Sequence, residues 1–510
     1  MAQDRPRVIS LHPSDDVLVA LSELPAGSQL DRPGLACRDT IPAGHKVALR
    51  DIPAGEPVRK YGQIIGFACQ DIAAGGHVHS HNLVFQAFDR DLAVGSEAKP
   101  TAYTPSEQRD SFQGYLRADG RVGTRNYLGV LATVNCSASV CHFIARALTP
   151  EALAAYPQVD GVVALGHGGG CGGAETKSLG FTYLQRVLAG HARHPNFAGI
   201  LLVGLGCEGN QVQLLMENME LSQGPLLRAM NIQDQGGTRR TVDEGVALLK
   251  EMLPVANQAR RQTLPASRLL LGLECGGSDA YSGLTANPAL GAAVDILVRQ
   301  GGTAILSETP EIYGAEHLLT RRAVSPEVGR KLAQRIAWWE RYARENGASL
   351  DNNPSPGNKA GGLTTILEKS LGAVSKGGTT NLVEVYEYAQ PVTAQGMVFM
   401  DTPGYDTVSI TGMLAGGANL ICFTTGRGSV CGSKPAPTLK LATNSAMYGR
   451  MSEDMDVNCG AIADGEATVD EMGRKIFDLM LAIASGQPSK SEAQGFGDQE
   501  FVPWPLGAVL

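Results

Sequence analysis

The sequence predicts a small all-β domain at the N-terminus, followed by two α/β regions with mostly parallel sheets. Three observations support this fold class. Near-identical turns recur four times between residues 24 and 75, short apolar runs alternate with helical patterns from about residue 127, and glycine-rich loops follow most of those runs. Such alternation is typical of parallel sheets covered by helices. We expect a small all-β domain over 1–86, a linker over 87–112, and α/β domains over 113–265 and 266–510.

The N-terminal turns share one pattern, an apolar residue followed by Pro or Ala, then Ala-Gly, at 24–27, 41–44, 52–55 and 72–75. Proline presets φ and glycine accepts a positive φ, so each copy ends a strand in a tight turn. His45 and Lys46 follow the second copy. His77, His79 and His81 follow the fourth, and alternate residues of a strand share one face. These histidines form either a metal or carboxylate site or an ordinary polar surface.

Residues 87–109 are polar and contain Pro100 and Pro105, which is typical of an interdomain linker. Beyond the linker, the first α/β region alternates strands and helices. We expect strands over 128–134, 161–165 and 199–203, and helices over 138–147, 174–189 and 211–219. The pattern predicts a doubly wound parallel sheet.

The second α/β region contains expected strands over 303–306, 397–401 and 419–423. Ser325 is a natural N-cap for a helix over 325–345, with Pro326 in its first turn. The stretch 353–362 is rich in Pro, Gly and Asn, and we expect a long non-helical loop there. An amphipathic helix is expected over about 470–484.

Four cysteines follow strand-like runs, and one of them lies in the loop Gly166–Gly173 together with His167. The four are Cys136, Cys171, Cys207 and Cys275. Carboxyl ends of strands gather at one edge of an open parallel sheet, so these thiols are expected to converge on one ion or cluster. Soft thiolates suit iron or an iron–sulfur cluster, with Mn²⁺ as another possibility. With three protein ligands, an iron ion keeps a position open for substrate. The alternative is that the thiols only line a pocket as small hydrophobes.

Polar residues in other loops suit an acidic substrate. The candidates are Lys46, Arg125, Asn126, Ser278, Asp279, Asn358 and Arg427. Arginine offers a planar fork that matches a carboxylate. Gly204–Gly209 also matches G-x-G-x-x-G, the pattern of a dinucleotide loop. Cys207 and Glu208 at its inner positions would crowd a pyrophosphate, so an NAD-dependent oxidoreductase is a weak alternative.

Composition excludes several classes of protein. The chain of 510 residues has 18% charged residues and a net charge of −8, with no long basic run that would indicate nucleic-acid binding. It has no run of 18 apolar residues and no signal-peptide pattern, so we expect a cytoplasmic protein. The ten cysteines are not closely paired, which favours reduced thiols.

The chain resembles the altronate/galactarate dehydratase family of sugar-acid dehydratases over nearly its full length. The blocks that carry the resemblance are 44–49, 121–126, 204–211, 273–283, 354–362 and 424–428. Within the family, His77–Asn82 and Gly206–Gln211 look closer to altronate dehydratase. The resemblance implies an N-terminal SAF domain, an iron-dependent lyase and a 2,3-dihydroxy acid substrate. One departure is Gly168–Gly170 before Cys171, where both subfamilies carry an aromatic residue.

That departure leaves the substrate open, and a sulfolactate-type sulfo-lyase of the same superfamily is an alternative, as is a non-catalytic sugar-acid sensor. We expect iron on Cys136, Cys171 and Cys207, with Cys275 as fourth ligand or pocket wall. His45 or His167 is the expected acid/base group, followed by Lys359. The substrate would be an altronate-like aldonate or a galactarate-like aldarate, and a homodimer is a mild expectation.

Overall fold

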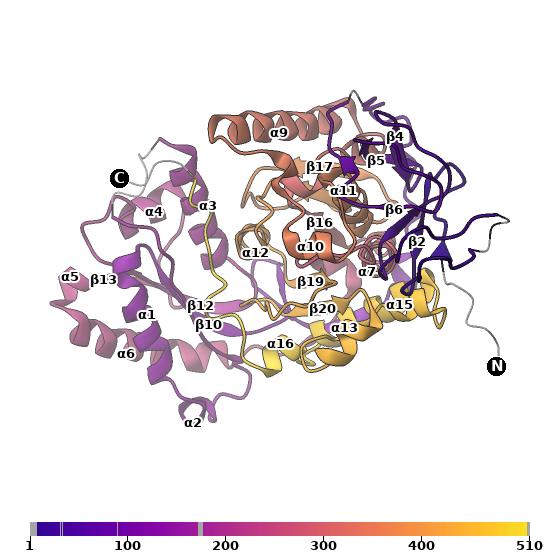
Figure 1. Cartoon of the computed structure of the whole chain (residues 1–510). Helices are drawn as coiled ribbons and strands as arrows, with labels where there is room; N and C mark the ends of the chain where they lie inside the picture. The colour runs from indigo at the N-terminus through magenta and orange to yellow at the C-terminus, as the bar shows by residue number, and fades with distance from the viewer. Residues whose placement is uncertain (1–7, 31, 33, 89, 172–176, 507–510) are drawn as a thin grey trace.

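The computed structural model describes residues 8–30, 32, 34–88, 90–171 and 177–506. Figure 1 shows the N-terminal β domain on the right, the second domain on the left and the C-terminal domain between them. Among the helices within these described ranges, none is long and apolar enough to cross a lipid bilayer.

The N-terminal domain consists of two small antiparallel sheets. In sheet order, the first contains β1 (Val8–Ile9), β2 (Val17–Ala20), β3 (Lys46–Ala48) and β6 (His77–Val78), and the second contains β4 (Pro57–Lys60), β5 (Gln63–Ala68) and β7 (Leu83–Val84). The glycines of all four predicted turns, Gly27, Gly44, Gly55 and Gly75, have φ between 81° and 89°. The all-β prediction is therefore confirmed, because these turns adopt the backbone that glycine alone accepts freely.

The second domain has a four-stranded parallel sheet. Its strand order is β11 (Gly161–Leu165), β10 (Tyr127–Ala132), β12 (Phe197–Gly204) and β13 (Leu227–Asn231). One face packs on α1 (Asn135–Ala147) and α6 (Thr238–Ala256), and the other on α3 (Leu179–Ala192) and α4 (Val212–Asn218). The short elements are α2 (Pro150–Leu153), α5 (Ile232–Gln235) and a small antiparallel sheet of β14 (Gln262–Pro265), β8 (Ser111–Leu116) and β9 (Val122–Gly123).

The C-terminal domain has a seven-stranded, fully parallel sheet. In order, its strands are β17 (Leu382–Tyr386), β18 (Met397–Met400), β16 (Thr303–Leu306), β15 (Leu270–Cys275), β19 (Leu420–Thr425), β20 (Thr438–Ala442) and β21 (Val457–Asn458). Its helices are α7 (Ala286–Arg299), α8 (His317–Thr320), α9 (Pro326–Glu345), α10 (Pro356–Ala360), α11 (Ile366–Val374), α12 (Asp406–Ala415), α13 (Ser445–Arg450), α14 (Ala461–Asp464), α15 (Val469–Ala484) and α16 (Lys490–Ala493).

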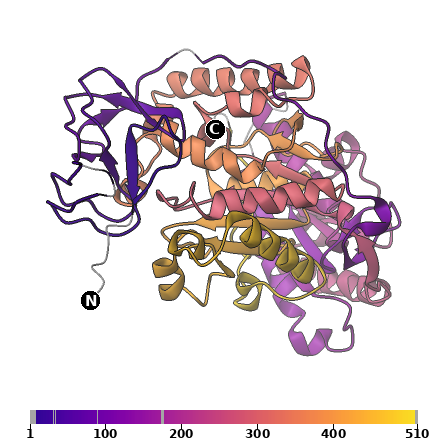
Figure 2. The same ribbon diagram turned by 90° about the vertical axis from the view of Figure 1, so that its right-hand side faces the viewer.

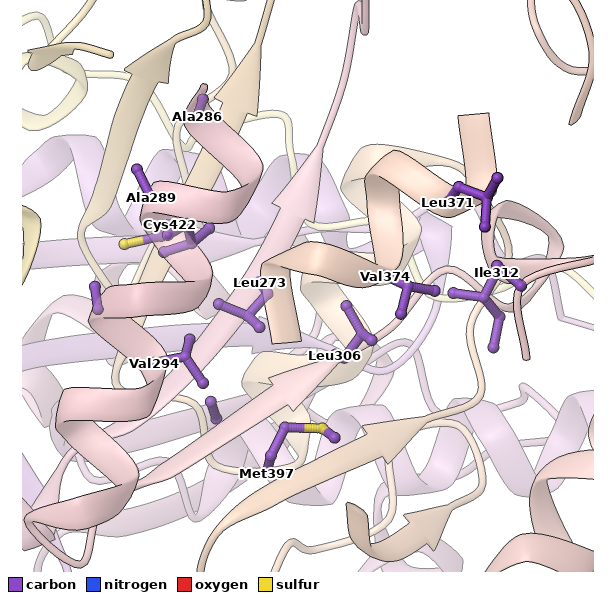
Figure 3. Packing of buried hydrophobic residues seen from close by; sticks show 14 of the residues in the cluster. Leu273, Ala286, Ala289, Val294, Leu306, Ile312, Leu371, Val374, Met397 and Cys422 are labelled. Carbon is purple, nitrogen blue, oxygen red and sulfur yellow. The ribbon is translucent and has the colours of Figure 1, made fainter. Parts of the chain in front are cut away.

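The sheet of the C-terminal domain is buried on both faces. Figure 3 shows Leu273 and Cys422 beside Ala289 and Val294 of α7, and Leu306 beside Val374 of α11. Helix α12 covers the other face, where Ile410 and Met413 are buried. Near-continuous apolar strands of this kind are expected where helices cover both faces of a parallel sheet.

Two local expectations differ from the structure. Helix α1 begins at Asn135, so Cys136 lies in a first helical turn and not in a loop. Helix α10 lies inside the expected loop 353–362, because Ser355 and Asn358 form a reciprocal capping box around Pro356. The helix expected over 174–189 begins at Leu179, and 172–176 lie outside the described residues. The expectation for α9 is confirmed, since the Ser325 side chain accepts from Val328 N.

Candidate active site

The structure divides the predicted site residues into two groups. Cys136, Cys171, Cys207 and His167 gather at the carboxyl edge of the second domain's sheet. His45 and the loops around α10 meet where the N-terminal and C-terminal domains touch. In Figure 1, α1 and α4 lie on the left of the molecule, whereas α10 lies toward the N-terminal domain.

In the second domain, three strand ends carry thiols at one edge of the sheet, and two of these thiols are in contact. The sulfur atoms of Cys136 and Cys171 are 3.8 Å apart. Gly209 N donates to Cys171 O over 2.8 Å, so the loop after β12, which carries Cys207, touches the loop after β11. The hydrogen bond with Cys136 is the main reason why the pKa of Cys171 is raised. All three thiols are exposed, so this arrangement offers soft ligands to an incoming metal ion.

In the glycine-rich loop Gly204–Gly209, backbone N–H groups donate to the side chain of Glu208, which belongs to the same loop. Glu208 is buried and accepts from Leu205 N at 3.0 Å, Gly206 N at 2.7 Å and Thr133 Oγ1 at 2.8 Å. The backbone N–H groups that would hold a pyrophosphate are therefore occupied from within. This geometry argues against the dinucleotide interpretation of the motif.

His167 is buried beside the thiols. Its Nδ1 accepts from Gly169 N at 3.1 Å, and burial lowers its pKa to about 4, so the ring is neutral at pH 7. The ring lines a cavity of about 520 Å³ that Phe181, Phe501 and Trp504 complete. The C-terminal segment thus crosses back onto the second domain and closes one side of this cavity.

At the domain junction, histidines of the N-terminal domain contact the end of α10. His79 Nε2 donates to Lys359 O at 2.9 Å, and His45 Nε2 lies 3.4 Å from Ala360 O. Because a carbonyl oxygen can only accept, His45 carries its hydrogen on Nε2. Its Nδ1 then accepts from His77 Nε2 at 3.0 Å. Burial, with a smaller contribution from His79, lowers the pKa of His45 to about 4, which leaves a neutral imidazole at pH 7.

Next to this contact is a pocket of about 310 Å³ with polar walls. Arg427, which follows β19, and Arg450, at the end of α13, both line it. Within the described residues, neither guanidinium has a hydrogen bond or ion pair. The sequence predicted Arg427 but missed Arg450, whose signal was its position on the short helix that follows β20. Two unpaired guanidinium groups in one pocket suit a substrate with carboxylate groups.

Asp279 forms part of the pocket wall. It accepts from Thr443 Oγ1 at 2.9 Å, Ser282 N at 2.9 Å and Asn444 Nδ2 at 3.0 Å. These bonds tie the loop after β15 to the loop after β20. Asp279 therefore shapes the pocket and holds neighbouring donors in place.

At the carboxyl end of β15, just before the loop that carries Asp279, is a buried cluster of charged groups. The Cys275 thiol lies 3.4 Å from both Glu308 Oε2 and Glu311 Oε2, and 2.8 Å from Lys376 Nζ. Lys376 pairs with Glu308 at 2.6 Å, and Lys369 pairs with Glu311 at 2.6 Å. Cys275 thus lies among carboxylates and lysines of the C-terminal domain, and its polar contacts among the described residues do not include the other three predicted thiols.

The cluster has more acidic than basic groups. Four carboxyl groups, on Glu274, Glu308, Glu311 and Asp406, face the two lysines. Burial and the neighbouring Glu308 raise the pKa of Glu274 well above its usual value. Burial works against ionisation of Glu308 as well, but Lys376 outweighs it and lowers the pKa of Glu308. Burial, followed by the charge of Glu308, raises the pKa of Asp406 to about 7.

The same cluster has the donor atoms for a metal ion. Ligand atoms of Cys275, Glu308 and Glu311 lie within 4.8 Å of one another, as do those of Glu274, Glu308 and Asp406. Among the described residues, neither buried oxygen of Glu274 has a hydrogen-bond donor. Glu308 also has φ of +65°, an uncommon conformation that clusters at functional sites. A cation would supply the missing positive charge, and the mixed sulfur and oxygen donors are compatible with iron or Mn²⁺.

Other predicted site residues make structural contacts instead of lining a pocket. Arg125 is buried and binds Glu492 with two bonds, at 2.7 and 2.8 Å, and Asn126 Nδ2 donates to Gln158 O. Both precede β10 and so lie at the opposite end of that strand from Cys136. Strand direction, which the charge pattern alone does not reveal, is the reason for the difference.

Four further candidates surround α10 and the domain junction. Asn358 Nδ2 donates to Ser278 O at 2.8 Å, while its Oδ1 caps the same helix. Lys46 is fully buried and pairs with Glu368 at 2.8 Å. Lys359 offers its carbonyl to His79. Through these contacts the residues position the loop and the histidines.

Models of known protein families match the N-terminal, middle and C-terminal parts of the chain. Family models match residues 6–86 (Altronate/galactarate dehydratase SAF domain), 114–257 (D-galactarate dehydratase/Altronate hydrolase, second domain) and 266–509 (D-galactarate/Altronate dehydratase, C-terminal). Altronate dehydratase of Bacillus subtilis (strain 168) is 35% identical over 516 residues, covering 98% of this chain and 99% of that protein. Galactarate dehydratase (L-threo-forming) of Escherichia coli (strain K12) is 38% identical over 487 residues, covering 94% and 93%.

A more distant relative consists of two subunits. The beta subunit of (2R)-sulfolactate sulfo-lyase from Chromohalobacter salexigens is 31% identical over 402 residues, covering 77% of this chain and 96% of that subunit. The alpha subunit from the same organism is 50% identical over 46 residues, covering 9% of this chain and 49% of that subunit.

Proposed function

The chain belongs to the D-galactarate/altronate dehydratase family and is a hydro-lyase, and we propose that it dehydrates an aldonate or aldarate to a 2-keto-3-deoxy acid. The observation that carries this proposal is the pocket at the domain junction. It holds two arginines that are unpaired among the described residues, and the ring of neutral His45 contacts Ala360, which also lines it.

The pocket residues divide the chemistry between them. Arg427 and Arg450 bind carboxylate groups of the sugar acid. A proton leaves the carbon next to the carboxylate, and the hydroxyl on the following carbon departs as water. The resulting enol tautomerises to the keto acid. Guanidinium groups placed where negative charge develops would stabilise this step, each by about 2.7–4 kcal/mol.

His45 is our candidate for the group that exchanges protons. With Nε2 protonated and Nδ1 hydrogen-bonded to His77, the ring has a proton route to the surface of the N-terminal domain. Lys359, whose backbone anchors His79, is the next candidate. His167 retains the same role only if substrate binds in the second domain's cavity, where the ring is also neutral.

Metal assistance is part of the proposal, with two possible sites. One is the thiol group of Cys136, Cys171 and Cys207, where the close sulfurs suit iron or an iron–sulfur cluster. The other is the set of Cys275, Glu308 and Glu311 in the buried cluster. A bound metal ion would act as a Lewis acid on a substrate oxygen.

Turnover of a small panel of acids tests the function. Altronate, galactarate and sulfolactate are incubated anaerobically with the purified protein and Fe(II), and keto-acid formation is measured. We expect keto acid from altronate or galactarate, and loss of most turnover in Arg427→Ala. Keto acid from neither acid would refute the proposal.

A sulfo-lyase is the second candidate function. It is favoured by the 31% identical relative, whose beta subunit is matched over 96% of its length. The glycines at 168–170 beside Cys171 leave room near the thiols, which agrees with a bulkier leaving group. In the same panel, sulfite released from sulfolactate without keto acid from the sugar acids would establish this alternative.

A further inference from the structure

One charged group of the N-terminal domain interface is not explained by the chemistry above. Glu368, on α11, lies between Lys46 of β3 and Lys60 of β4, and all three side chains are 0% exposed. Lys46 Nζ is 2.8 Å from Glu368 Oε2, and Lys60 Nζ is 2.9 Å from Oε1. Thr364 N and Oγ1 donate to the same carboxylate at 3.0 and 2.7 Å. We call these three charged residues the docking triad.

The triad is surrounded by apolar contacts that cross the domain boundary. A single hydrophobic cluster contains residues from both domains, including Val58, Ile65 and Leu83 on one side and Ile366 and Leu371 on the other. Figure 2 shows the N-terminal domain lying directly against helices of the C-terminal domain. The two domains therefore share one core, as parts of a single folding unit or tightly bound subunits do.

Polar contacts around the triad join the domains further. Lys46 Nζ donates to Gly362 O at 2.7 Å, and Tyr281 Oη donates to Leu21 O at 3.1 Å. Gly362 has φ of +98°, and a Cβ there would lie 2.5 Å from Gly44 O, so the two backbones cross without a side chain between them. Such close packing of two backbones is typical of a specific interface.

The linker segment 95–104 lies outside the shared hydrophobic cluster. It runs along the surface of the C-terminal domain, where Gly95 N donates to Thr320 O at 2.9 Å and Thr104 N donates to Arg299 O at 2.7 Å. Tyr103 is 53% exposed, and Ala102 beside it is exposed as well. A cut between these two residues would remove no hydrogen bond that the described residues make across the domain boundary.

We propose that the N-terminal domain is an independently docked module, recognised through the buried carboxylate of Glu368, and that the covalent linker is dispensable for holding it. Without Lys46 and Lys60, the Glu368 carboxylate would be a buried, uncompensated charge, which is strongly unfavourable. The surface around α11 therefore selects a β domain that presents two amines at the spacing of Lys46 and Lys60. The two-subunit sulfo-lyase shows that sequence related to this chain is divided between two polypeptides elsewhere.

Cleavage of the folded full chain tests the proposal. A site for a specific protease is inserted between Ala102 and Tyr103, the purified protein is cut, and the products are examined by size-exclusion chromatography and mass spectrometry. We expect both fragments to elute together, and the N-terminal fragment to separate only under denaturing conditions. Fragments that part spontaneously after cleavage would refute the proposal.

Variants of the triad test the recognition step. In the cut protein, Lys46→Met and Lys60→Met are expected to speed dissociation of the N-terminal fragment by at least about tenfold, measured by exchange with labelled fragment. Both changes leave the larger fragment unaltered, so its misfolding cannot explain the result. Glu368→Gln should act in the same direction.

The matched control is Glu492→Gln, which removes a buried carboxylate partner from Arg125 at a different contact. It is expected to leave fragment exchange unchanged. If the lysine variants exchange as slowly as the unmodified protein, shape and apolar contact alone hold the module, and the role assigned to Glu368 is wrong. None of these readouts depends on catalysis, so the outcome is separate from that of the proposed function.

Discussion

The two ring nitrogens of His45 face different groups: Nε2 faces the carbonyl of Ala360, which lines the arginine pocket, and Nδ1 faces His77. Its tautomer follows from the Ala360 carbonyl, which can only accept. We expect His45→Ala to lower kcat by about 10²- to 10⁴-fold, the range for loss of an acid/base group. The measurement is steady-state turnover with thermal unfolding in parallel.

The control for this substitution is His81→Ala. The His81 ring is exposed, and its centroid lies 5.4 Å from that of His77, outside the contacts with α10. It should retain nearly full activity. A His45→Ala protein that keeps kcat within a few-fold, with an unchanged melting temperature, would remove His45 from the mechanism.

Arg427 and Arg450 face the same pocket from different loops. Because neither is paired within the described residues, their loss should weaken substrate binding with little effect on folding. We expect Arg427→Lys and Arg450→Lys each to raise KM by about tenfold, since an ammonium cannot reproduce the bidentate fork. Lys434→Met, which removes an ion pair to Asp498 outside this pocket, is the comparison. An unchanged KM in both arginine variants would place the substrate elsewhere.

At the scale of elements, the positions of the strand ends explain which parts of the candidate site could be predicted from the sequence and which could not. Apolar runs followed by glycine predicted the thiol positions, and β10, β11 and β12 do place Cys136, Cys171 and Cys207 at one edge. Cys275 follows the same local pattern, but its strand belongs to the other sheet. Which sheet a strand joins is set by long-range pairing, such as that of β15 with β16 and β19, and no local pattern contains that information.

Metal content distinguishes the two strand-end clusters. If the thiol group holds the iron, Cys171→Ser should lose most of the bound metal and Glu308→Gln should keep it. If the buried cluster holds it, the reverse is expected, because Glu308 belongs to both ligand sets there. Elemental analysis after anaerobic loading with Fe(II) and desalting gives the answer without an activity assay. Metal retained in both variants would contradict both assignments.

On the scale of the whole molecule, the sequence predicted the three-part architecture well because its signals were local. The four glycine turns and the alternation of apolar runs with helical patterns each act over a few residues. The domain interface had no such signal. Lys46 looked like a substrate ligand, yet its partner Glu368 is more than three hundred positions away, and a buried ion pair looks in sequence like two separate surface charges.

Buried histidines make the stability of the whole chain depend on pH. Burial lowers the pKa of His191 to about 4 and that of His194 to about 3, against about 6.5 in an unfolded chain. The folded state therefore binds fewer protons than the unfolded state between these values. The stabilisation is complete above about pH 6.5 and is lost as the pH falls toward 4. Asp406 acts in the opposite direction, because its pKa is raised to about 7 and folding takes up a proton there.

The histidines and Asp406 change stability in opposite directions with pH. The informative quantity is therefore the difference in stability between the unmodified protein and a variant that lacks one of these groups. Within the described part of the chain, His191 Nε2 has no hydrogen-bond partner, and the ring contacts Phe501. His191→Phe should therefore keep the packing and remove the titration. Relative to this variant, the unmodified protein should lose up to about 1.4 kcal/mol of stability per pH unit between pH 6.5 and 4. Urea unfolding midpoints at several pH values measure this. The control is Phe501→Leu, which disturbs the same contact without removing a proton site and should shift the urea midpoint by the same amount at every pH. If His191→Phe also shifts the midpoint by the same amount at every pH, His191 does not change its protonation on unfolding.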